Sequence, residues 1–438
     1  MNLSDSERIA SVLEKIGYKK ALNIKQADLI LVNMCSVRQS AVDRVYGIAV
    51  RFKELKTKNY KLKTILTGCV LKKDRIKFKK KFDLILDIKD LGNWPKLLSY
   101  DFNDRRKHTT EYKDYLKIKP EYESSFSGLI PIMTGCNNFC SYCAVPHARG
   151  REVSRSAKEI LDEIKNLIKK NYKEIWLLGQ NVNSYRSTGK NSSAVASAKA
   201  DKIIKFPKLL RMINNIPGNF WIRFTSPHPK DFSDELIETM VKCKKMTPYL
   251  NLPAQSGDNK VLKRMNRPYK IERYKKIVKK IRKAFKKYRK RIETEIAIST
   301  DIIVGFPRET KKQFESTVKL FKEVKYDMAY IAKYSPRPGT TANKLKDNVS
   351  LEEKERRYKI LTEILKETAL ENNKKYIGEE VEVLVEEKKD NFLIGKTRSY
   401  KTVKLQTTNY KLQTNLVGQF VKVKIIDASS WGLKGYSF

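Results

Sequence analysis

Three cysteines gather in one short segment, TGCNNFCSYC, where they stand at Cys136, Cys140 and Cys143. The chain has six cysteines in 438 residues, and its N-terminus carries no basic-then-apolar secretory signal. Thiols in such a chain are expected to bind metal or to react rather than to form disulfides. The spacing would also suit three core cysteines on one helix face. Gly135 and the nearby Pro146 favour a loop instead, so a metal site is predicted.

The number of cysteines narrows the kind of metal site. A structural zinc site needs four ligands, and the nearest candidate for a fourth is His147. An iron-sulfur cubane is normally held by four thiolates, so three cysteines would leave one iron open. Catalytic zinc sites show that an open coordination position is where a substrate or cofactor binds. Zinc and an open iron-sulfur cluster are the two possibilities that the residues leave.

Two further cysteines, Cys35 and Cys69, each follow the C-terminal end of a predicted strand. Open α/β sheets bind their ligands at that edge. A lone cysteine there would most often be a small buried hydrophobe, but two at equivalent positions indicate a second site. The remaining one, Cys243, lies at the end of a predicted helix, where we expect it to contribute to packing.

The elements around Cys35 and Cys69 alternate between helix and strand, which predicts an α/β domain with a parallel sheet over residues 1–104. This type of sheet normally begins with a strand, whereas here a helix comes first. The expected order is a helix at 3–18, a strand at 27–34, a helix at 39–56, a strand at 63–68, a further helix, and a strand at 82–88.

A polar linker from about Asp101 to Ser125 precedes a second domain, expected at 122–352. Six apolar runs, each followed by polar residues and a helical pattern, predict a partial (βα)6 barrel with its active site at the C-terminal strand ends. A small-residue stretch at 187–202 reads as an insertion loop without chemistry. The runs cover 128–133, 174–179, 219–226, 249–255, 299–306 and 327–334, and the polar residues near their ends include Gln180, Asn181, Ser226, His228, Gln255, Ser256, Asp301 and Tyr334.

The last segment, 375–438, alternates apolar and polar residues with turns between, which predicts a small antiparallel barrel. The basic residues of its strands form either a face that binds nucleic acid or ordinary solvent-exposed strand faces, and the segment alone does not decide between these two interpretations. The net charge of +43 favours an RNA or DNA partner, with a lysine-rich composition as the alternative. No apolar run is long enough to cross a membrane, so a cytoplasmic protein is expected. The basic residues are Lys396, Arg398, Lys401, Lys404, Lys422 and Lys424.

Several long motifs resemble the radical S-adenosylmethionine (SAM) methylthiotransferase family. They include GCNNFCSYCAVPHARGREVSRS (135–156), LLGQNVNSY (177–185), LPAQSGDNKVLKRMNRPY (252–269), STDIIVGFP (299–307) and KYSPRPGT (333–340). NMCSVRQSAVDRVYG (33–47) and LTGC (66–69) resemble the N-terminal domain of that family, and the last segment is similar to the RNA-binding TRAM domain. The resemblance implies a [4Fe-4S] cluster that binds SAM on its open iron and cleaves it with one electron to generate a 5′-deoxyadenosyl radical.

The likeness is closest to the branch that makes 2-methylthio-N6-dimethylallyladenosine beside the tRNA anticodon. Its implied partners are a tRNA anticodon stem-loop and an electron donor such as flavodoxin or ferredoxin, and a monomer is expected. The alternatives are a sibling enzyme acting on ribosomal protein S12 or on threonylcarbamoyl-adenosine in tRNA, and a degenerate iron-sulfur protein that binds RNA. The resemblance assigns the radical cluster to Cys136, Cys140 and Cys143, an auxiliary sulfur-donating [4Fe-4S] cluster to Cys35 and Cys69, and SAM contacts to Gly179, Gln180, Asn181, Ser226, Gln255 and Asp301.

The family pattern has a third N-terminal cysteine, which lies on a first strand just before a Met-Asn pair. Met1 and Asn2 occupy that pair here, followed by the matching DSERIA. We therefore expect the first strand and its cysteine to lie upstream of Met1. Without them the auxiliary cluster would have an incomplete ligand set.

Overall fold

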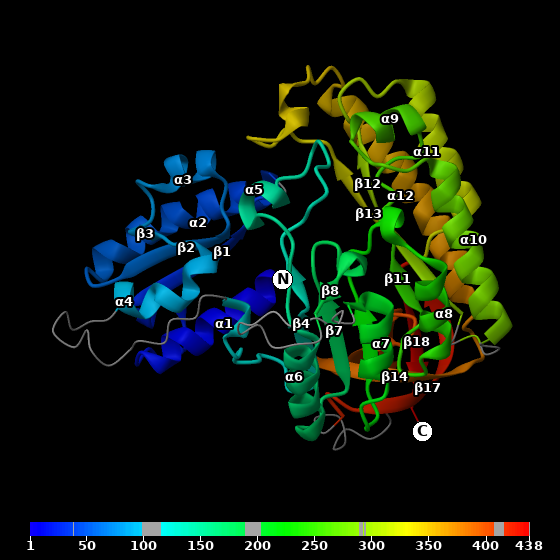
Figure 1. Cartoon of the computed structure of the whole chain (residues 1–438), viewed down its shortest axis with the longest axis horizontal. Coiled ribbons are helices and arrows are strands. Elements are labelled where there is room, and N and C mark those ends of the chain that lie inside the picture. The colour runs from blue at the N-terminus through cyan, green and yellow to red at the C-terminus, as the bar shows by residue number, and fades with distance from the viewer. Residues whose placement is uncertain are drawn as a thin grey trace, which may run out of the picture. The chain divides into compact units, whose positions relative to one another are not determined.

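The computed structural model describes residues 1–37, 39–98, 115–188, 203–288, 292, 295–406 and 416–437 (Figure 1). The chain divides into two compact units. The first comprises Met1–Glu123, Thr134–Glu152 and Ser335–Lys344. The second comprises Ser124–Met133, Val153–Tyr334 and Leu345–Phe438. The segment with three cysteines therefore belongs to the same unit as Cys35 and Cys69.

The first unit is built on a parallel sheet in the order β1-β2-β3. This confirms the α/β fold expected for the N-terminal part. The strands are β1 (Leu29–Cys35), β2 (Lys63–Cys69) and β3 (Leu84–Ile85), and the helices are α1 (Asn2–Lys15), α2 (Gln39–Lys58), α3 (Lys72–Phe78) and α4 (Trp94–Leu98).

Alternate side chains of β1 enter two separate cores, because successive residues of a strand point to opposite faces. Ile30 and Val32 pack with the core formed by α2 and α3. Leu29 and Leu31 pack with the core formed by α1 and α4. In Figure 1 these two pairs of helices lie on opposite sides of the sheet. Both faces are covered, as a parallel sheet requires.

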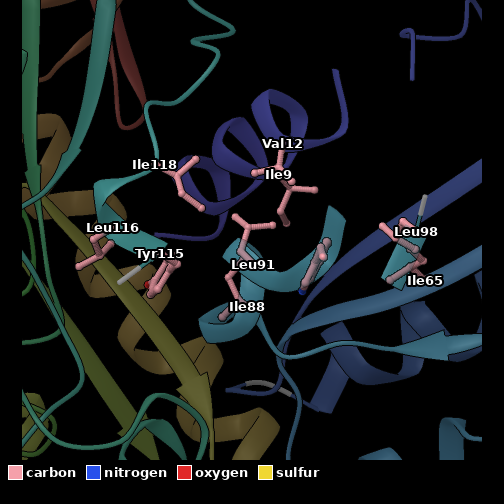
Figure 2. Close-up of a cluster of buried hydrophobic side chains, with 10 residues drawn as sticks. Ile9, Val12, Ile65, Ile88, Leu91, Leu98, Tyr115, Leu116 and Ile118 are labelled. Carbon is pink, nitrogen blue, oxygen red and sulfur yellow. The ribbon is translucent and has the colours of Figure 1, made fainter. Parts of the chain in front are cut away.

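Part of the predicted linker is core. Residues 101–114 of that linker lie outside the described part of the chain, but Tyr115, Leu116 and Ile118 are buried beside Ile9 and Leu91 (Figure 2). The prediction of a linker running to Ser125 is therefore wrong for these residues. The charged composition of the stretch concealed three large apolar side chains that the N-terminal core recruits.

The second unit contains six strands of a partial barrel in two parallel sheets, ordered β10-β7-β4 and β11-β12-β13. An isolated parallel bridge from Ile222 to Met246 links β10 to the segment that leads into β11. The predicted (βα)6 architecture is confirmed. The strands are β4 (Ser127–Pro131), β7 (Glu174–Leu178), β10 (Trp221–Phe224), β11 (Tyr249–Asn251), β12 (Ala297–Val304) and β13 (Met328–Lys333).

Amphipathic helices follow these strands and bury their apolar stripes against them. In α6, for example, Ile160, Ile164 and Leu167 are buried while the lysines face outward. No helix among the described residues is long and apolar enough to cross a membrane. The predicted insertion at 187–202 lies almost wholly outside the described residues. The helices are α6 (Ala157–Lys169), α7 (Phe206–Asn214), α8 (Asp234–Lys242), α9 (Asn259–Arg264), α10 (Ile271–Tyr288), α11 (Lys311–Val324) and α12 (Leu351–Lys374).

The C-terminal segment closes into a five-stranded barrel in the order β14-β15-β16-β18-β17. The prediction of an entirely antiparallel barrel is wrong for one pair, because β16 and β18 run parallel. An odd number of strands cannot close with every neighbour antiparallel, so one parallel pair is required. The strands are β14 (Glu380–Lys389), β15 (Phe392–Thr397), β16 (Thr402–Gln406), β17 (Phe420–Ser429) and β18 (Gly432–Tyr436).

A buried arginine fastens this small barrel to the larger one within the second unit. Arg223 Nε donates to Glu174 Oε1 at 2.6 Å, and both side chains are buried. Its terminal nitrogens donate to the carbonyls of Thr397 at 3.0 Å and Arg398 at 2.8 Å. Glu174 is the first residue of β7 and Arg398 also donates to Lys244 O, ahead of β11. The small barrel therefore contacts the N-terminal ends of the parallel strands.

Candidate metal and cofactor site

The three clustered cysteines lie in a loop ahead of α5 (Val145–Arg149), as predicted, and not on a helix. Gly135 has φ +77, and a Cβ at this position would stand 1.9 Å from Arg151 O, so only glycine fits. Cys136 N donates to Gly150 O at 3.1 Å, and Cys143 N donates to Cys140 O at 3.0 Å. The first bond joins the start of the loop to the residue after α5, and the second closes a turn between Cys140 and Cys143.

Nitrogen donors already point at two of the sulfurs. Asn138 Nδ2 lies 3.7 Å from Cys136 Sγ, and Val145 N lies 3.5 Å from Cys143 Sγ. Burial raises the pKa of the Cys136 thiol, and the hydrogen bonds from Asn138 oppose that rise. Donors of this kind stabilise a thiolate, which is the form that binds metal.

The spacing of the three sulfurs bears on how they could bind a cluster. Among the described residues, no three His, Cys, Asp or Glu side chains are close enough to hold a single metal ion. In a four-iron cluster each thiolate binds a different iron, so the sulfurs need not converge on one point. A loop with three sulfurs and two N–H···S donors fits that group.

β1 and β2 each run one residue further than predicted, so Cys35 and Cys69 are the last residues of these strands rather than the residues that follow them. The two cysteines are directly opposite each other in the register of the parallel pair. Gly68 precedes Cys69 with φ +94, and a Cβ there would stand 2.3 Å from Asn33 Oδ1. The pair thus presents two neighbouring thiols at the C-terminal edge of the sheet, which fit two ligands of an auxiliary cluster. Cys243 is buried at the end of α8, in the second unit, as expected for a packing residue.

Arg149 is a site residue that the sequence reading missed. Its Nε donates to Cys69 Sγ at 3.1 Å, and one terminal nitrogen donates to Tyr115 Oη at 3.3 Å. The other donates to Asp5 Oδ2 at 2.5 Å and to Asn2 Oδ1 at 3.1 Å. The only signal in the sequence was its place in the HARG motif behind the cysteine loop. One guanidinium thereby connects that loop with the thiol at the end of β2.

Arg149 and its buried neighbours shift one another's pKa values. Burial raises the pKa of the Cys69 thiol, and the guanidinium of Arg149 opposes that rise. Burial would lower the pKa of Arg149, but Cys69 and Asp5 raise it well above its ordinary value. Burial beside Asp5 also raises the pKa of Tyr115 to about 12. Arg149 therefore stays charged and Tyr115 stays a neutral hydroxyl at any physiological pH.

A second arginine secures the other end of this sheet edge. Arg337, from the PRPGT motif, donates to Asp74 Oδ2 at 3.3 Å and to the side-chain oxygen of Gln39. Ser36, directly after Cys35, donates to the same Asp74 oxygen at 3.2 Å. The motif at 335–340 therefore belongs to the surroundings of the cysteine pair, as part of the first unit.

In the second unit, the ends of the barrel strands carry buried polar atoms that lack a partner among the described residues. They include Gln180 Oε1 and Asn181 Oδ1 after β7, His228 Nε2 after β10, and Tyr334 Oη after β13. Buried polar groups are nearly always hydrogen-bonded, so four such atoms at one end of a barrel indicate a polar ligand. They fit SAM or a polar substrate.

Asn181 and His228 are oriented by further contacts. Asn181 Nδ2 donates to Asp231 Oδ2 at 3.0 Å, which leaves its oxygen as the open acceptor. His228 Nδ1 accepts from Lys230 N at 3.1 Å, and burial lowers its pKa to about 2. A neutral imidazole that accepts at Nδ1 carries its proton on Nε2. His228 thus offers a buried N–H donor.

The remaining SAM candidates differ in their placement. Ser226 follows β10 and Gln255 follows β11, and both have a left-handed backbone, with φ 56 and φ 68 respectively. This conformation changes the direction of the chain after each strand. Gly179 is closely packed, since a Cβ would stand 2.7 Å from Met133 Cγ. The strand-end placement of Asp301 is wrong, because β12 continues to Val304. Asp301 still lies beside Gln255, whose N donates to Asp301 O at 2.8 Å.

Comparison with known proteins gives three family matches. Residues 130–321 match the radical SAM superfamily, residues 1–87 match the uncharacterized protein family UPF0004, and residues 374–436 match the TRAM domain. A protein of Clostridium botulinum (strain Langeland) named tRNA-2-methylthio-N(6)-dimethylallyladenosine synthase is 41% identical over 99% of this chain and 94% of its own length. A protein of the same name from Thermoanaerobacter sp. (strain X514) is 40% identical over 99% of this chain and 90% of its own.

Among solved structures, the radical S-adenosylmethionine methyltransferase TsrM from Kitasatospora setae superimposes with a TM-score of 0.52. The match covers 78% of this chain and 72% of TsrM at 13% sequence identity, so it supports the fold alone. The relatives that match over nearly their whole length place the chain in a family. This chain belongs to the radical SAM methylthiotransferases, enzymes that use SAM and a [4Fe-4S] cluster and carry a second cluster.

Proposed function

We propose that this protein converts N6-(dimethylallyl)adenosine beside the tRNA anticodon to its 2-methylthio derivative. The observation that carries the proposal is the similarity to synthases of that name, which extends over 99% of this chain and 94% of the relative. Similarity over the whole length includes the N-terminal cysteine pair, the cysteine loop and the C-terminal barrel together.

Cys136, Cys140 and Cys143 would hold the radical cluster, and Cys35 and Cys69 would supply ligands to the auxiliary one. When bound, the radical cluster and SAM supply a hydrogen-abstracting radical through one-electron cleavage of SAM. The loop itself contributes the N–H donors of Asn138 and Val145, which stabilise the thiolates. Gly179, Gln180, Asn181, Ser226, Gln255 and Asp301 are the proposed SAM contacts.

The barrel end would orient the ligand and keep water out. Asn181 presents an acceptor and His228 a donor, and both are buried, so neither needs to reorganise when the ligand binds. A radical must be shielded from solvent to react only with its substrate. The burial of these strand ends supports that role.

The proposed partners follow from the same assignment. We infer that the RNA substrate is the anticodon stem-loop, because the modified nucleoside lies beside the anticodon. A low-potential donor such as flavodoxin or ferredoxin would deliver the electron. The protein is proposed to act as a cytoplasmic monomer.

The test uses the full chain with its clusters reconstituted, SAM and a reductant. Three substrates are compared: tRNA carrying N6-(dimethylallyl)adenosine, tRNA carrying N6-(threonylcarbamoyl)adenosine, and ribosomal protein S12. Mass spectrometry is expected to detect methylthiolation of the first only. Methylthiolation of either other substrate would overturn the assignment.

A further inference from the structure

A basic groove lies beside the ends of β10 and β11. It has a volume of about 610 Å³ and is formed by α9 and the loop that leads into α10. Four cationic residues line it, namely Lys260, Lys263, Arg267 and Lys270. The three lysines are exposed, and no carboxylate is among the described residues that line the groove.

The floor of the groove is rigid and connected to the barrel. Arg267 is buried, and its Nε donates to Tyr269 Oη at 3.1 Å. Tyr269 Oη also bonds to the carbonyl of Ala254 at 3.0 Å, directly before Gln255. The ring of Tyr269 meets the ring of His228 edge to face, with centroids 5.8 Å apart. The groove thus adjoins two strand ends that carry proposed ligand contacts.

We propose that this groove binds backbone phosphates of the RNA substrate next to the nucleotide that enters the barrel. The proposal rests on the proposed function. An RNA whose base lies at the strand ends must run its backbone over the neighbouring surface, and exposed lysines with an ordered arginine between them suit phosphates. The C-terminal barrel contacts the opposite, N-terminal ends of the strands through Arg223, so a phosphate contact at this end has to come from other residues.

A second lysine-rich groove, along α10, serves as a comparison because carboxylates already neutralise part of its charge. The groove along α10 includes Glu272, and two of its lysines are already paired: Lys275 with Glu323, and Lys280 with Asp234 at 2.7 Å. Its other lysines, Lys276, Lys279 and Lys283, are exposed on the same helix. They provide a control with the same loss of charge.

The test compares K260A/K263A/K270A with K276A/K279A/K283A in the full chain. The probe is a fluorescent anticodon stem-loop carrying N6-(dimethylallyl)adenosine, titrated at several salt concentrations. Removing one lysine that binds a phosphate reduces the slope of log affinity against log salt by about one. The groove variant is expected to bind roughly tenfold or more weakly, with a slope smaller by about 2 to 3. The control variant is expected to stay within about threefold of the wild type with an unchanged slope.

The outcomes separate the two proposals. Equal weakening of both variants would mean that the charge acts non-specifically, and it would overturn the proposal that the groove binds phosphates. A groove variant that binds like the wild type would overturn it as well. Thermal melting of both variants checks that weaker binding is not unfolding. Failure of the wild type to bind or modify the stem-loop would instead count against the proposed function.

Discussion

Replacement of Arg149 by methionine would test how the cysteine loop is tied to the N-terminal sheet. The Arg149 side chain is 3% exposed and its partner Asp5 is 0% exposed. Methionine preserves most of the volume but leaves the carboxylate buried without its cation. Removal of one partner of a buried ion pair costs about 3–5 kcal/mol. Loss of the bonds to Tyr115 and Cys69 acts in the same direction.

Hydrogen exchange is the suitable assay, because a chain of two units does not unfold in one step. Backbone amides of α1 and β2 in the metal-free protein should exchange roughly 150- to 5,000-fold faster in the variant, which is the same 3–5 kcal/mol expressed as an opening constant. Amides of β12 and β13, in the second unit, should not change.

Arg151→Met is the matched control. Arg151 is exposed two residues further along the chain, after the end of α5, and lies over the ring of Phe139, 4.6 Å from its centroid, a contact worth about 0.5–1 kcal/mol. The double variant Asp5→Asn with Arg149→Met should recover part of the loss, because no unpaired carboxylate remains. If Arg149→Met exchanged no faster than Arg151→Met, the buried pair would not be what joins the loop to the sheet.

Other expectations concern the clusters, the small barrel and pH. Cys140→Ala should abolish release of 5′-deoxyadenosine from SAM, whereas Cys35→Ala should keep it but block sulfur insertion; equal loss of both steps would contradict two separate roles. Arg223→Met should loosen the C-terminal barrel by about 3–5 kcal/mol, seen as faster exchange at Thr397–Lys401, and unchanged exchange would refute the clamp. Burial raises the pKa of Glu386 to about 7, so the folded state holds this proton more tightly than the unfolded chain does. The C-terminal barrel should therefore become less stable as pH rises from about 4.5 to about 7, by at most about 3 kcal/mol, seen in the hydrogen exchange of β14 amides corrected for the intrinsic effect of pH on exchange. Glu386→Gln should flatten that dependence, and a variant that kept the full slope would rule out Glu386 as its source.

Much of the fold followed from local patterns. The runs that became β7 and β12 could be predicted because most of their residues are buried, and the helices between the strands repeat their apolar positions at the helical period. The cysteine loop could also be predicted, because Gly135 and the three thiols lie within a dozen residues of one another. Such features depend on neighbours in sequence, so the sequence alone determined them.

Contacts between segments far apart in the sequence could not be predicted. Arg149 and Cys69 are 80 positions apart, and no periodicity marks the arginine as the partner of that thiol. Tyr115 and Leu116 were predicted to lie in a linker because their burial depends on contacts with α1 and η2 (Ile88–Asn93). In each case a long-range packing or pairing energy decided the outcome, and only the tertiary structure contains it.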